Sequence, residues 1–440
     1  MSDEEKMHEQ GTLTRTMSKE TSVDVVVSDS PAAIQYPEGG LRAWLTVLGG
    51  FMVMFCTFGA VQAFGVYQDY YTRISLNDHP PSDASWIGSL QTFLLFAVGW
   101  PAGSLYDNGY FHWLLGCGSI IYLFSLFMLS LVQPHHYYQN ILAQGLGIGL
   151  GMGLIFLPSL SLASHYFKAR RTAAMGLMLS GSSIGGVIYP IMQNHIFAGP
   201  GGFPWGVRAA GFTCLFMLIC ANLVMKPRLP NKRQQKNPYV VNTWSIFTDV
   251  PYLFCIFGSF FSFWGLFVPF FYLQLFATKH GVPSSLAIYA ISILNAAGLF
   301  GRTIPNILAD HWGPFNVMIP VTAISGCLIF AMFGATNEIG LVLFAIVYGF
   351  FSGGFVSIIA PASATFSKDV GEVGTRIGIM CFVSGFALLT GNPIAGVLLD
   401  PPNYVWRRPI IFAGVTVLFG SFLLTVSRHM QAKRKNTSRL

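Results

Sequence analysis

The chain has 440 residues, of which 53% are hydrophobic and 10% are charged, whereas an average soluble domain has about 25% charged residues. This composition excludes a soluble globular protein, and the long apolar blocks exclude disordered, collagen-like and coiled-coil chains. The net charge of +7 is compatible with a nucleic-acid partner or with a membrane protein that carries its Lys and Arg on the cytoplasmic side, and the distribution of these charges decides between the two.

Residues 1–41 are polar and mixed in charge, and we expect a disordered cytoplasmic tail there. Twelve apolar segments follow, each long enough for the ~20 residues that cross a bilayer core. In chain order they span residues 44–66, 86–105, 113–132, 140–163, 172–195, 206–225, 251–275, 284–308, 314–334, 339–362, 376–399 and 407–426. The predicted fold is therefore an all-α membrane protein with twelve transmembrane helices.

A long polar stretch separates the first six segments from the last six. The expected parts are an N-terminal six-helix bundle at 42–225, a cytoplasmic central loop at 226–250, a C-terminal six-helix bundle at 251–427 and a basic cytoplasmic tail at 428–440. The halves repeat weakly, because Asp107 after the second segment is echoed by Asp310 after the eighth. Such a pseudo-repeat is typical of duplicated transporter folds.

The basic residues are distributed unevenly along the chain. With the N-terminus inside, nineteen of the 25 Lys and Arg residues lie on the cytoplasmic side, and Arg302 lies within a segment. This asymmetry predicts two cytoplasmic termini and explains the positive charge without nucleic acid; we expect the plasma membrane as the location. The seven cysteines lie in apolar stretches without a C-x-x-C pair, so we expect no disulfide framework, metal site or cofactor.

Four motifs carry a resemblance to a known family. They are the G-x-x-x-D-x-G turn from Gly103 to Gly109, PEGGLRAW from Pro37 to Trp44, YFKARRTAAMGLMLSGSSIGG from Tyr166 to Gly186, and SILNAAGLFGRTIPNILAD from Ser292 to Asp310. The turn and the twelve segments resemble the major facilitator superfamily. The motifs at Pro37–Trp44 and Tyr166–Gly186 resemble its monocarboxylate porter family, and the motif at Ser292–Asp310 is similar to the fungal branch of that family.

The resemblance implies two six-helix halves that rock about a central site near the bilayer midplane. This chain departs from the family's animal lactate carriers at two positions. Those carriers have an aspartate one turn before the eighth-segment arginine, where this chain has Gly298, and a first-segment lysine, where this chain has Val66. Proton-coupled lactate transport is therefore not implied.

Arg302 is the most informative residue in the apolar segments. On a helix it lies eight positions before Asp310, about 12 Å deeper in the membrane. An arginine there costs about 2.5 to 3.5 kcal/mol and needs a counter-charge or a polar cavity, yet every Asp and Glu falls at a segment end or in a loop. Two interpretations follow: a substrate carboxylate or enolate docks on the guanidinium, or Arg302 extends to the cytoplasmic face and caps carbonyls there.

Other polar side chains in the segments are expected to face the same cavity. The predicted substrate-binding residues are Arg302, Asn295, Gln62, Tyr272, Gln274, Tyr348 and Asn392. His195 and Asp69 are proton-carrier candidates only at segment ends, so facilitated diffusion is as plausible as proton symport.

Asp107 and Asp310 occupy equivalent cytoplasmic positions in the two halves. A carboxylate there meets either a helix N-terminus or a basic cluster, and we expect latches that hold one access state. The predicted gating residues are Asp107, Asp310, Lys168, Arg170, Arg171 and Arg376. The alternatives are turn residues that set topology and basic clusters that contact anionic lipids.

Two patterns bear on packing and on substrate size. Five alternating glycines in the fourth segment, from Gly145 to Gly153, leave two helix faces free of side chains and predict close contact with two neighbouring helices. In the seventh segment Phe260, Trp264, Phe267 and Phe271 form a stripe. This stripe either packs or faces lipid, or else forms an apolar wall for a bulky substrate.

These observations predict a secondary transporter that carries an organic anion or acidic metabolite by alternating access. The alternatives are an efflux carrier of a bulky lipophilic secondary metabolite and a membrane sensor that binds a ligand without moving it. An enzyme is not expected, because H-E-x-x-H, G-x-S-x-G and a pair of intramembrane acids are all missing from the sequence. The expected partners are a small anionic molecule and the lipid bilayer, and we expect a monomer.

Overall fold

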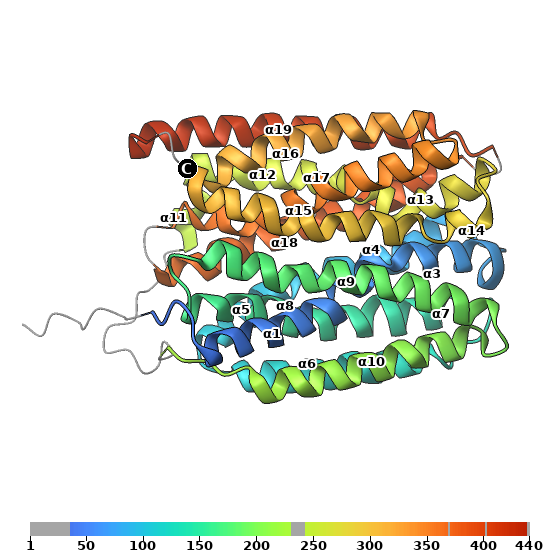
Figure 1. Ribbon diagram of the computed structural model, residues 1–440, viewed down its shortest axis with the longest axis horizontal. Helices are drawn as coiled ribbons and strands as arrows, with labels where there is room; N and C mark the ends of the chain where they lie inside the picture. The colour runs from blue at the N-terminus through green and yellow to red at the C-terminus, as the bar shows by residue number, and fades with distance from the viewer. Residues whose placement is uncertain (1–35, 230–242, 368–369, 401–402, 438–440) are drawn as a thin grey trace, which may run out of the picture. The chain divides into compact units, whose positions relative to one another are not determined.

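The protein is described by a computed structural model over residues 36–229, 243–367, 370–400 and 403–437. Within these ranges every regular element is a helix, and the helices run side by side (Figure 1). The all-α membrane fold is confirmed. Most of the tail expected at 1–41 lies outside the described residues, as does the part of the central loop at 230–242.

The first ten α-helices form what we call the first helix group. Its elements are α1 Leu41–Cys56, α2 Phe58–Gln62, α3 Phe64–Tyr70, η1 Tyr71–Ser75, α4 Pro81–Ala97, α5 Gly99–Asp107, α6 Phe111–Leu129, α7 Tyr137–Asn140, η2 Ile141–Ile148, α8 Gly149–Ser161, η3 Leu162–His165, α9 Arg171–Ala198 and α10 Gly202–Val224. Of these, η1 and η2 are π-helical and η3 is a 3₁₀ turn.

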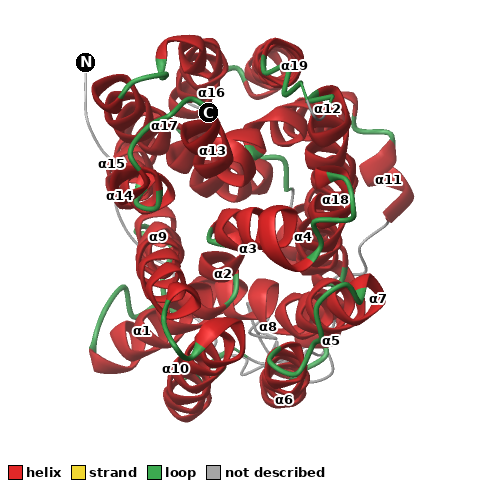
Figure 2. Ribbon diagram, turned by 90° about the vertical axis from the view of Figure 1, so that its right-hand side faces the viewer, coloured by secondary structure: helices red, strands yellow, loops and turns green. Residues whose placement is uncertain are grey.

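The remaining long helices form the second helix group, which follows the short α11 Thr243–Phe247. Its elements are α12 Val250–Leu266, α13 Val268–Lys279, α14 Ser284–Ala287, α15 Ala290–Trp312, α16 Pro314–Ala331, η5 Met332–Gly334, α17 Glu338–Ala364, α18 Val370–Leu398 and α19 Arg407–Lys435. Figure 2 looks along the helices and shows α1, α6, α8 and α10 on one side and α12, α16, α17 and α19 on the other.

Among the described residues, eleven helical stretches are long and apolar enough to cross a membrane. The other predicted segment, 86–105, is present as α4 and α5, which are separated at Val98. Pro101 has no N–H to donate to the Ala97 carbonyl, and its ring crowds that carbonyl. The interruption therefore divides one predicted span into two shorter helices, and the arrangement remains consistent with twelve spans.

The first span is longer than its apolar pattern predicts. Helical structure runs from Leu41 to Ser75, although the predicted segment ends at residue 66. The polar residues that end the apolar pattern satisfy one another, since Arg73 forms an ion pair with Asp69 one turn earlier. Asp69 therefore lies inside a helical span with 3% of its surface exposed, not beyond the segment's end.

Close helix contacts occur where the sequence has small residues. In η2 and α8, Gly145, Gly149 and Gly153 face α4 and its junction with α5, whereas Gly147 and Gly151 face α6. The two side-chain-free faces predicted for this segment are therefore confirmed as contact surfaces.

The two helix groups meet along a few long helices. Between the groups, α9 packs along α15, α4 along α18, and α3 against α13. Helix α1 begins and helix α19 ends at the same end of the helices, which we call the terminal end; α7 and α14 mark the other, distal end (Figure 1). At the terminal end α19 continues as helix to Lys435, so most of the predicted basic tail is an extension of the last span.

Candidate functional site

Arg302 lies on α15 at the boundary between the two helix groups, with 1% of its surface exposed. Its Nη1 donates to the Leu179 carbonyl at 3.2 Å and to the Ser182 hydroxyl, and its Nη2 donates to the side-chain oxygen of Gln62. Its guanidinium carbon lies 5.6 Å from the centre of the Phe58 ring. All of these neighbours belong to the first group, so Arg302 bridges the two groups.

The hydrogen-bond partners of Arg302 are electrically neutral, and its Nε has none. A buried cation without a carboxylate keeps much of its desolvation cost, because dipoles replace lost hydration less completely than an opposite charge does. An anion that enters this site therefore gains a charge-assisted interaction that the neutral acceptors do not provide.

Several phenylalanine rings lie around Phe58, the ring next to the Arg302 guanidinium. The Phe58 ring lies 6.1 Å from Phe96, 5.9 Å from Phe156 and 6.0 Å from Phe267, and Phe96 lies 5.8 Å from Phe263. These residues come from both helix groups. The predicted seventh-segment stripe is thus divided between this centre, which Phe267 joins, and the α12–α19 interface, where Trp264 packs on Phe412.

A small cavity lies within this phenylalanine cluster. It is lined by apolar side chains of α2, α4, α8, α9, α12, α17 and α18, with Ser384 as its one hydroxyl. Its volume is about 30 Å³, which has room for a water molecule but not for a metabolite. The described conformation is therefore closed around the centre, and a substrate needs the groups to separate.

Two predicted substrate-binding residues share the α9–α15 boundary with Arg302. Gln62 contacts it directly, and Asn295 lies two turns away on α15, where its Nδ2 donates to the Gly186 carbonyl at 3.1 Å. The Asn295 Oδ1 is buried without a hydrogen-bond partner. Tyr348 is instead bonded within the second group, where its hydroxyl donates to the Leu266 carbonyl at 2.6 Å.

The other three predicted residues lie nearer the distal end, and two of them, Tyr272 and Gln274, join the groups there. The Tyr272 hydroxyl is 2.6 Å from the hydroxyl of Ser85 and donates to the Asn392 carbonyl at 3.1 Å. Gln274 donates to Asp69 at 3.2 Å. We call Asp69, Ser85, Tyr272 and Gln274 the distal latch. The structure therefore separates Tyr272, Gln274 and Asn392 from Arg302, with which the sequence pattern had grouped them.

At the terminal end the two predicted aspartates lie near helix starts in the opposite group. Asp310 accepts a hydrogen bond from the Ala173 N–H in the first turn of α9, at 3.3 Å. A Cβ added to Gly374, near the start of α18, would lie 4.0 Å from Asp107 Oδ1. Both turns end in a glycine with positive φ, 93° at Gly109 and 95° at Gly313. The internal repeat therefore reappears as matched turns, and Asp310 adds a hydrogen bond across the groups.

Glu38 is a residue whose role sequence reasoning missed. Its carboxylate accepts hydrogen bonds from the backbone N–H groups of Lys168, Ala169 and Arg170 at 2.8, 2.7 and 3.3 Å. Burial, which favours the neutral acid, is outweighed by these N–H groups and the Arg170 charge, so the pKa of Glu38 is lowered. The contact joins the start of the PEGG motif to the fifth-segment motif, which lies 130 or more positions away in the sequence, so the sequence alone contains no signal for it.

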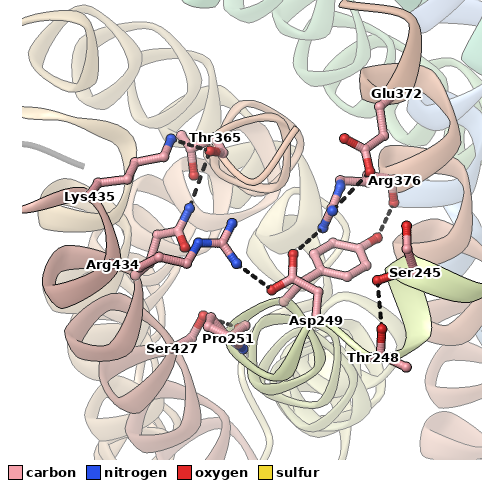
Figure 3. A network of polar contacts seen from close by, with 12 residues as sticks. Ser245, Thr248, Asp249, Pro251, Thr365, Glu372, Arg376, Ser427, Arg434 and Lys435 are labelled. Atoms are coloured by element: carbon pink, nitrogen blue, oxygen red, sulfur yellow. Dashed lines mark hydrogen bonds and ion pairs between the residues drawn. The ribbon is translucent and has the colours of Figure 1, made fainter. Parts of the chain in front are cut away.

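Arg376, predicted as a gating residue, sits in a network within the second group and the segment that leads into it (Figure 3). Its guanidinium contacts Asp249 at 2.8 Å and Glu372 at 2.9 Å, and it lies 4.7 Å from the Tyr252 ring centre. Arg434 near the end of α19 contacts the second oxygen of Asp249 at 2.8 Å. Arg376 therefore connects the starts of α12 and α18 to the end of α19.

Metal-ligand residues do not gather in the described ranges. No three His, Cys, Asp or Glu side chains lie close enough there to hold a metal ion. Buried Cys214 lies instead among tyrosines, with Tyr189 at 2.9 Å and Tyr122 at 3.3 Å from its sulfur. The described residues therefore give no ligand set to which a metal could be assigned.

Comparison with known proteins gives consistent matches. The family model of the Major Facilitator Superfamily matches residues 43–337. The MFS-type transporter dbaD of Emericella nidulans is 41% identical over 88% of this chain and 86% of its own length. The aspyridones efflux protein apdF of the same fungus is 38% identical over 96% and 86%, and the agnestins efflux protein AgnL12 of Paecilomyces divaricatus is 36% identical over 88% and 87%.

These relatives refine the resemblance drawn from the motifs. The superfamily is matched, whereas the named relatives are fungal MFS transporters and efflux proteins and not specifically monocarboxylate porters. The fifth- and eighth-segment motifs are therefore not specific enough to establish a monocarboxylate substrate.

Proposed function

The chain belongs to the major facilitator superfamily, and on that premise we propose that it exports a bulky, largely apolar metabolite carrying one acidic group. The observation that carries the proposal is the pairing of Arg302, held only by neutral groups, with a phenylalanine cluster at the boundary of the two helix groups. Rings favour an aromatic or lipophilic body through area burial, and the guanidinium favours a carboxylate or enolate.

The relatives support export over uptake. Two of them are named as efflux proteins for aspyridones and agnestins, which are their own substrates. Among the interpretations of the sequence, the efflux alternative is thereby favoured over import of a small organic anion. Our proposal retains one part of the organic-anion hypothesis: the exported molecule has an acidic group, because Arg302 supports binding of an anion.

In our mechanism the two groups are rigid bodies that separate first at one end and then at the other. The contact of Asp310 with the start of α9 closes the terminal end, and the distal latch closes the other. When the terminal contacts open, the substrate anion displaces Gln62 and Ser182 from Arg302 and its body packs on Phe58. When the distal latch opens, the return of these neutral side chains to Arg302 releases the substrate.

The orientation follows from charge. Because Lys and Arg concentrate at the terminal end, we place both termini in the cytoplasm and the distal latch outside, with the plasma membrane as the location. We further propose that the transporter works as a monomer and without a nucleic-acid partner. Transport, not catalysis or ligand sensing, is the proposed activity.

A metabolite comparison tests this function. A strain lacking the gene and its parent are grown alike, and extracts of cells and medium are compared by untargeted mass spectrometry. We expect at least one acidic, lipophilic compound to accumulate in the deletion cells and to decline in their medium. Restoring the wild-type gene should reverse both changes, whereas restoring it with Arg302→Ala should not. Identical profiles in deletion strain and parent would remove the export proposal.

A further inference from the structure

We infer that Ser384 on α18 binds a neutral oxygen of the exported molecule, on the side of its apolar body away from the acid that docks on Arg302; this inference rests on the proposed function. Ser384 lines the small cavity within the phenylalanine cluster and is the one residue with a hydroxyl among those that line it. The side chain is fully buried, and its Oγ has no hydrogen-bond partner among the described residues.

The Ser384 hydroxyl does not use the partner that its own helix offers. A serine inside a helix can donate to the carbonyl one turn earlier. Ser259 on α12 does so at 2.7 Å, and Ser352 on α17 does so at 2.6 Å. A water molecule is a poor substitute, because buried waters need two to four polar partners and the cavity lining has a single hydroxyl. A ligand that enters the cavity is therefore the partner that suits Ser384.

The cavity extends between two different boundaries of the helix groups. At one boundary, α9 packs along α15, and Leu179 lines the cavity while its carbonyl accepts a hydrogen bond from Arg302. At the other boundary, α4 packs along α18 (Figure 2). Ser384 precedes Gly385 there, where an added Cβ would lie 3.3 Å from the Phe93 ring of α4. A molecule in the enlarged cavity can therefore contact Arg302 at one boundary and Ser384 at the other.

The lining also limits the charge of the ligand. None of the residues that line the cavity is basic, so a second anionic group beside Ser384 would lose its hydration without gaining a counter-charge. A hydroxyl can instead donate to a neutral oxygen such as that of a ketone, an ester or a phenol. The substrate class is therefore a monoanion whose apolar body separates the acid from a neutral oxygen.

Complementation of the deletion strain tests the inference with the full-length protein. The strain receives the wild-type gene or its Ser384→Ala, Ser384→Thr or Ser159→Ala variant at matched expression, and acidic compounds in cells and medium are compared by mass spectrometry. Ser384→Ala should lower the medium-to-cell ratio of the exported compounds about 2- to 10-fold, the effect of one neutral hydrogen bond. Ser384→Thr, which keeps the hydroxyl, should restore the ratio.

Ser159→Ala is the matched control. Ser159 on α8 is also fully buried without a hydrogen-bond partner among the described residues, but it does not line the cavity. Either alanine removes a buried hydroxyl that has no partner, so both variants should unfold at the wild-type midpoint or above it. Only Ser384→Ala should change export. Lower export together with lower stability in Ser384→Ala would assign its hydroxyl to the fold and overturn the inference.

The inference and the proposed function fail separately. Equal export by wild type and Ser384→Ala, an equal loss in Ser159→Ala, or exported compounds without a neutral oxygen beyond the acid would each remove the role of Ser384 and keep the exporter. Metabolite profiles that do not change when the gene is deleted would remove the exporter, and the inference with it.

Discussion

Two arginines of the second helix group are equally buried but differently held. Arg302 and Arg376 each have 1% of their surface exposed. Arg376 is matched by Asp249 and Glu372, whereas Arg302 has a carbonyl, a hydroxyl and an amide oxygen. The first arginine is bound by neutral groups of the opposite helix group, and the second by carboxylates that belong to its own group or lead into it.

This difference indicates what each site can do. A guanidinium between two buried carboxylates is costly to free, because removing either partner leaves an uncompensated charge. A guanidinium that holds only neutral acceptors gains when an anion replaces them. The Arg376 network therefore fixes helices together, and the Arg302 site is suited to an exchange of partners during each transport cycle.

The comparison is tested most strongly by removing the paired arginine. Arg376→Met removes the guanidinium that both Asp249 and Glu372 contact and leaves Asp249 with Arg434, so we expect a loss of about 3 to 5 kcal/mol in stability. Thermal unfolding in detergent, followed by tryptophan fluorescence, measures it. The control is Arg408→Met, whose pair with Asp400 is about half exposed and should contribute less than about 1 kcal/mol. Equal losses in the two variants would contradict a structural role for the buried network.

Arg302→Lys should affect transport more than stability. The ammonium keeps the charge but cannot present two parallel donors, so we expect export to fall about 10- to 100-fold, the equivalent of one charged hydrogen bond of about 1.5 to 3 kcal/mol. Export of the metabolite found in the deletion comparison measures the change, and the unfolding midpoint should stay close to that of wild type. Near wild-type export would argue against docking of an anion on Arg302.

Two features could be interpreted from the sequence: the length of the apolar segments and the single charged residue inside one of them. Eleven spans and Arg302 follow from long apolar runs and from one charge inside them. Two other features did not follow from the sequence. The break at Val98 depends on local backbone geometry, and the helical extension past Val66 depends on the ion pair of Arg73 with Asp69. The sequence placed Asp69 at the end of the first segment, whereas it lies inside the helical stretch Leu41–Ser75.

The partners of the two arginines could not be predicted. Gln62 and Ser182 are 240 and 120 positions from Arg302, and Asp249 is 127 positions from Arg376. Helical periodicity relates residues within one segment but does not tell which segments are neighbours. The same reason explains why Tyr272 and Gln274 were grouped with Arg302 although they join the distal latch.

A third variant asks whether Arg302 is held by the close packing of its own helix. A Cβ at Gly301 would overlap the carbonyl oxygen of Phe350 on α17. Gly301→Ala should therefore force α15 and α17 apart, at a cost within the about 1 to 3 kcal/mol typical of overpacking. Gly116→Ala on α6 is the matched control, since nothing lies within 4 Å of its added Cβ, and it should be neutral or slightly stabilising. Unfolding midpoints compare them; an unchanged Gly301→Ala midpoint would contradict the packing argument.

The smallest effect is expected at Glu38, where a charge is balanced by the backbone. Its lowered pKa means that it stabilises the fold above its ordinary value of 4.5, and that this contribution is lost as the pH falls through the lowered pKa. Because Glu38 is partly exposed, screening limits the effect of Glu38→Gln to less than about 1 kcal/mol at neutral pH. The difference from wild type, measured as unfolding midpoints between pH 7 and pH 3, should shrink to zero at the acid end.

Glu338→Gln on α17 serves as the control for acid titration elsewhere. A difference that grew on acidification would mean that the protonated acid is the stabilising form, and hydrogen bonds from three N–H groups do not allow that.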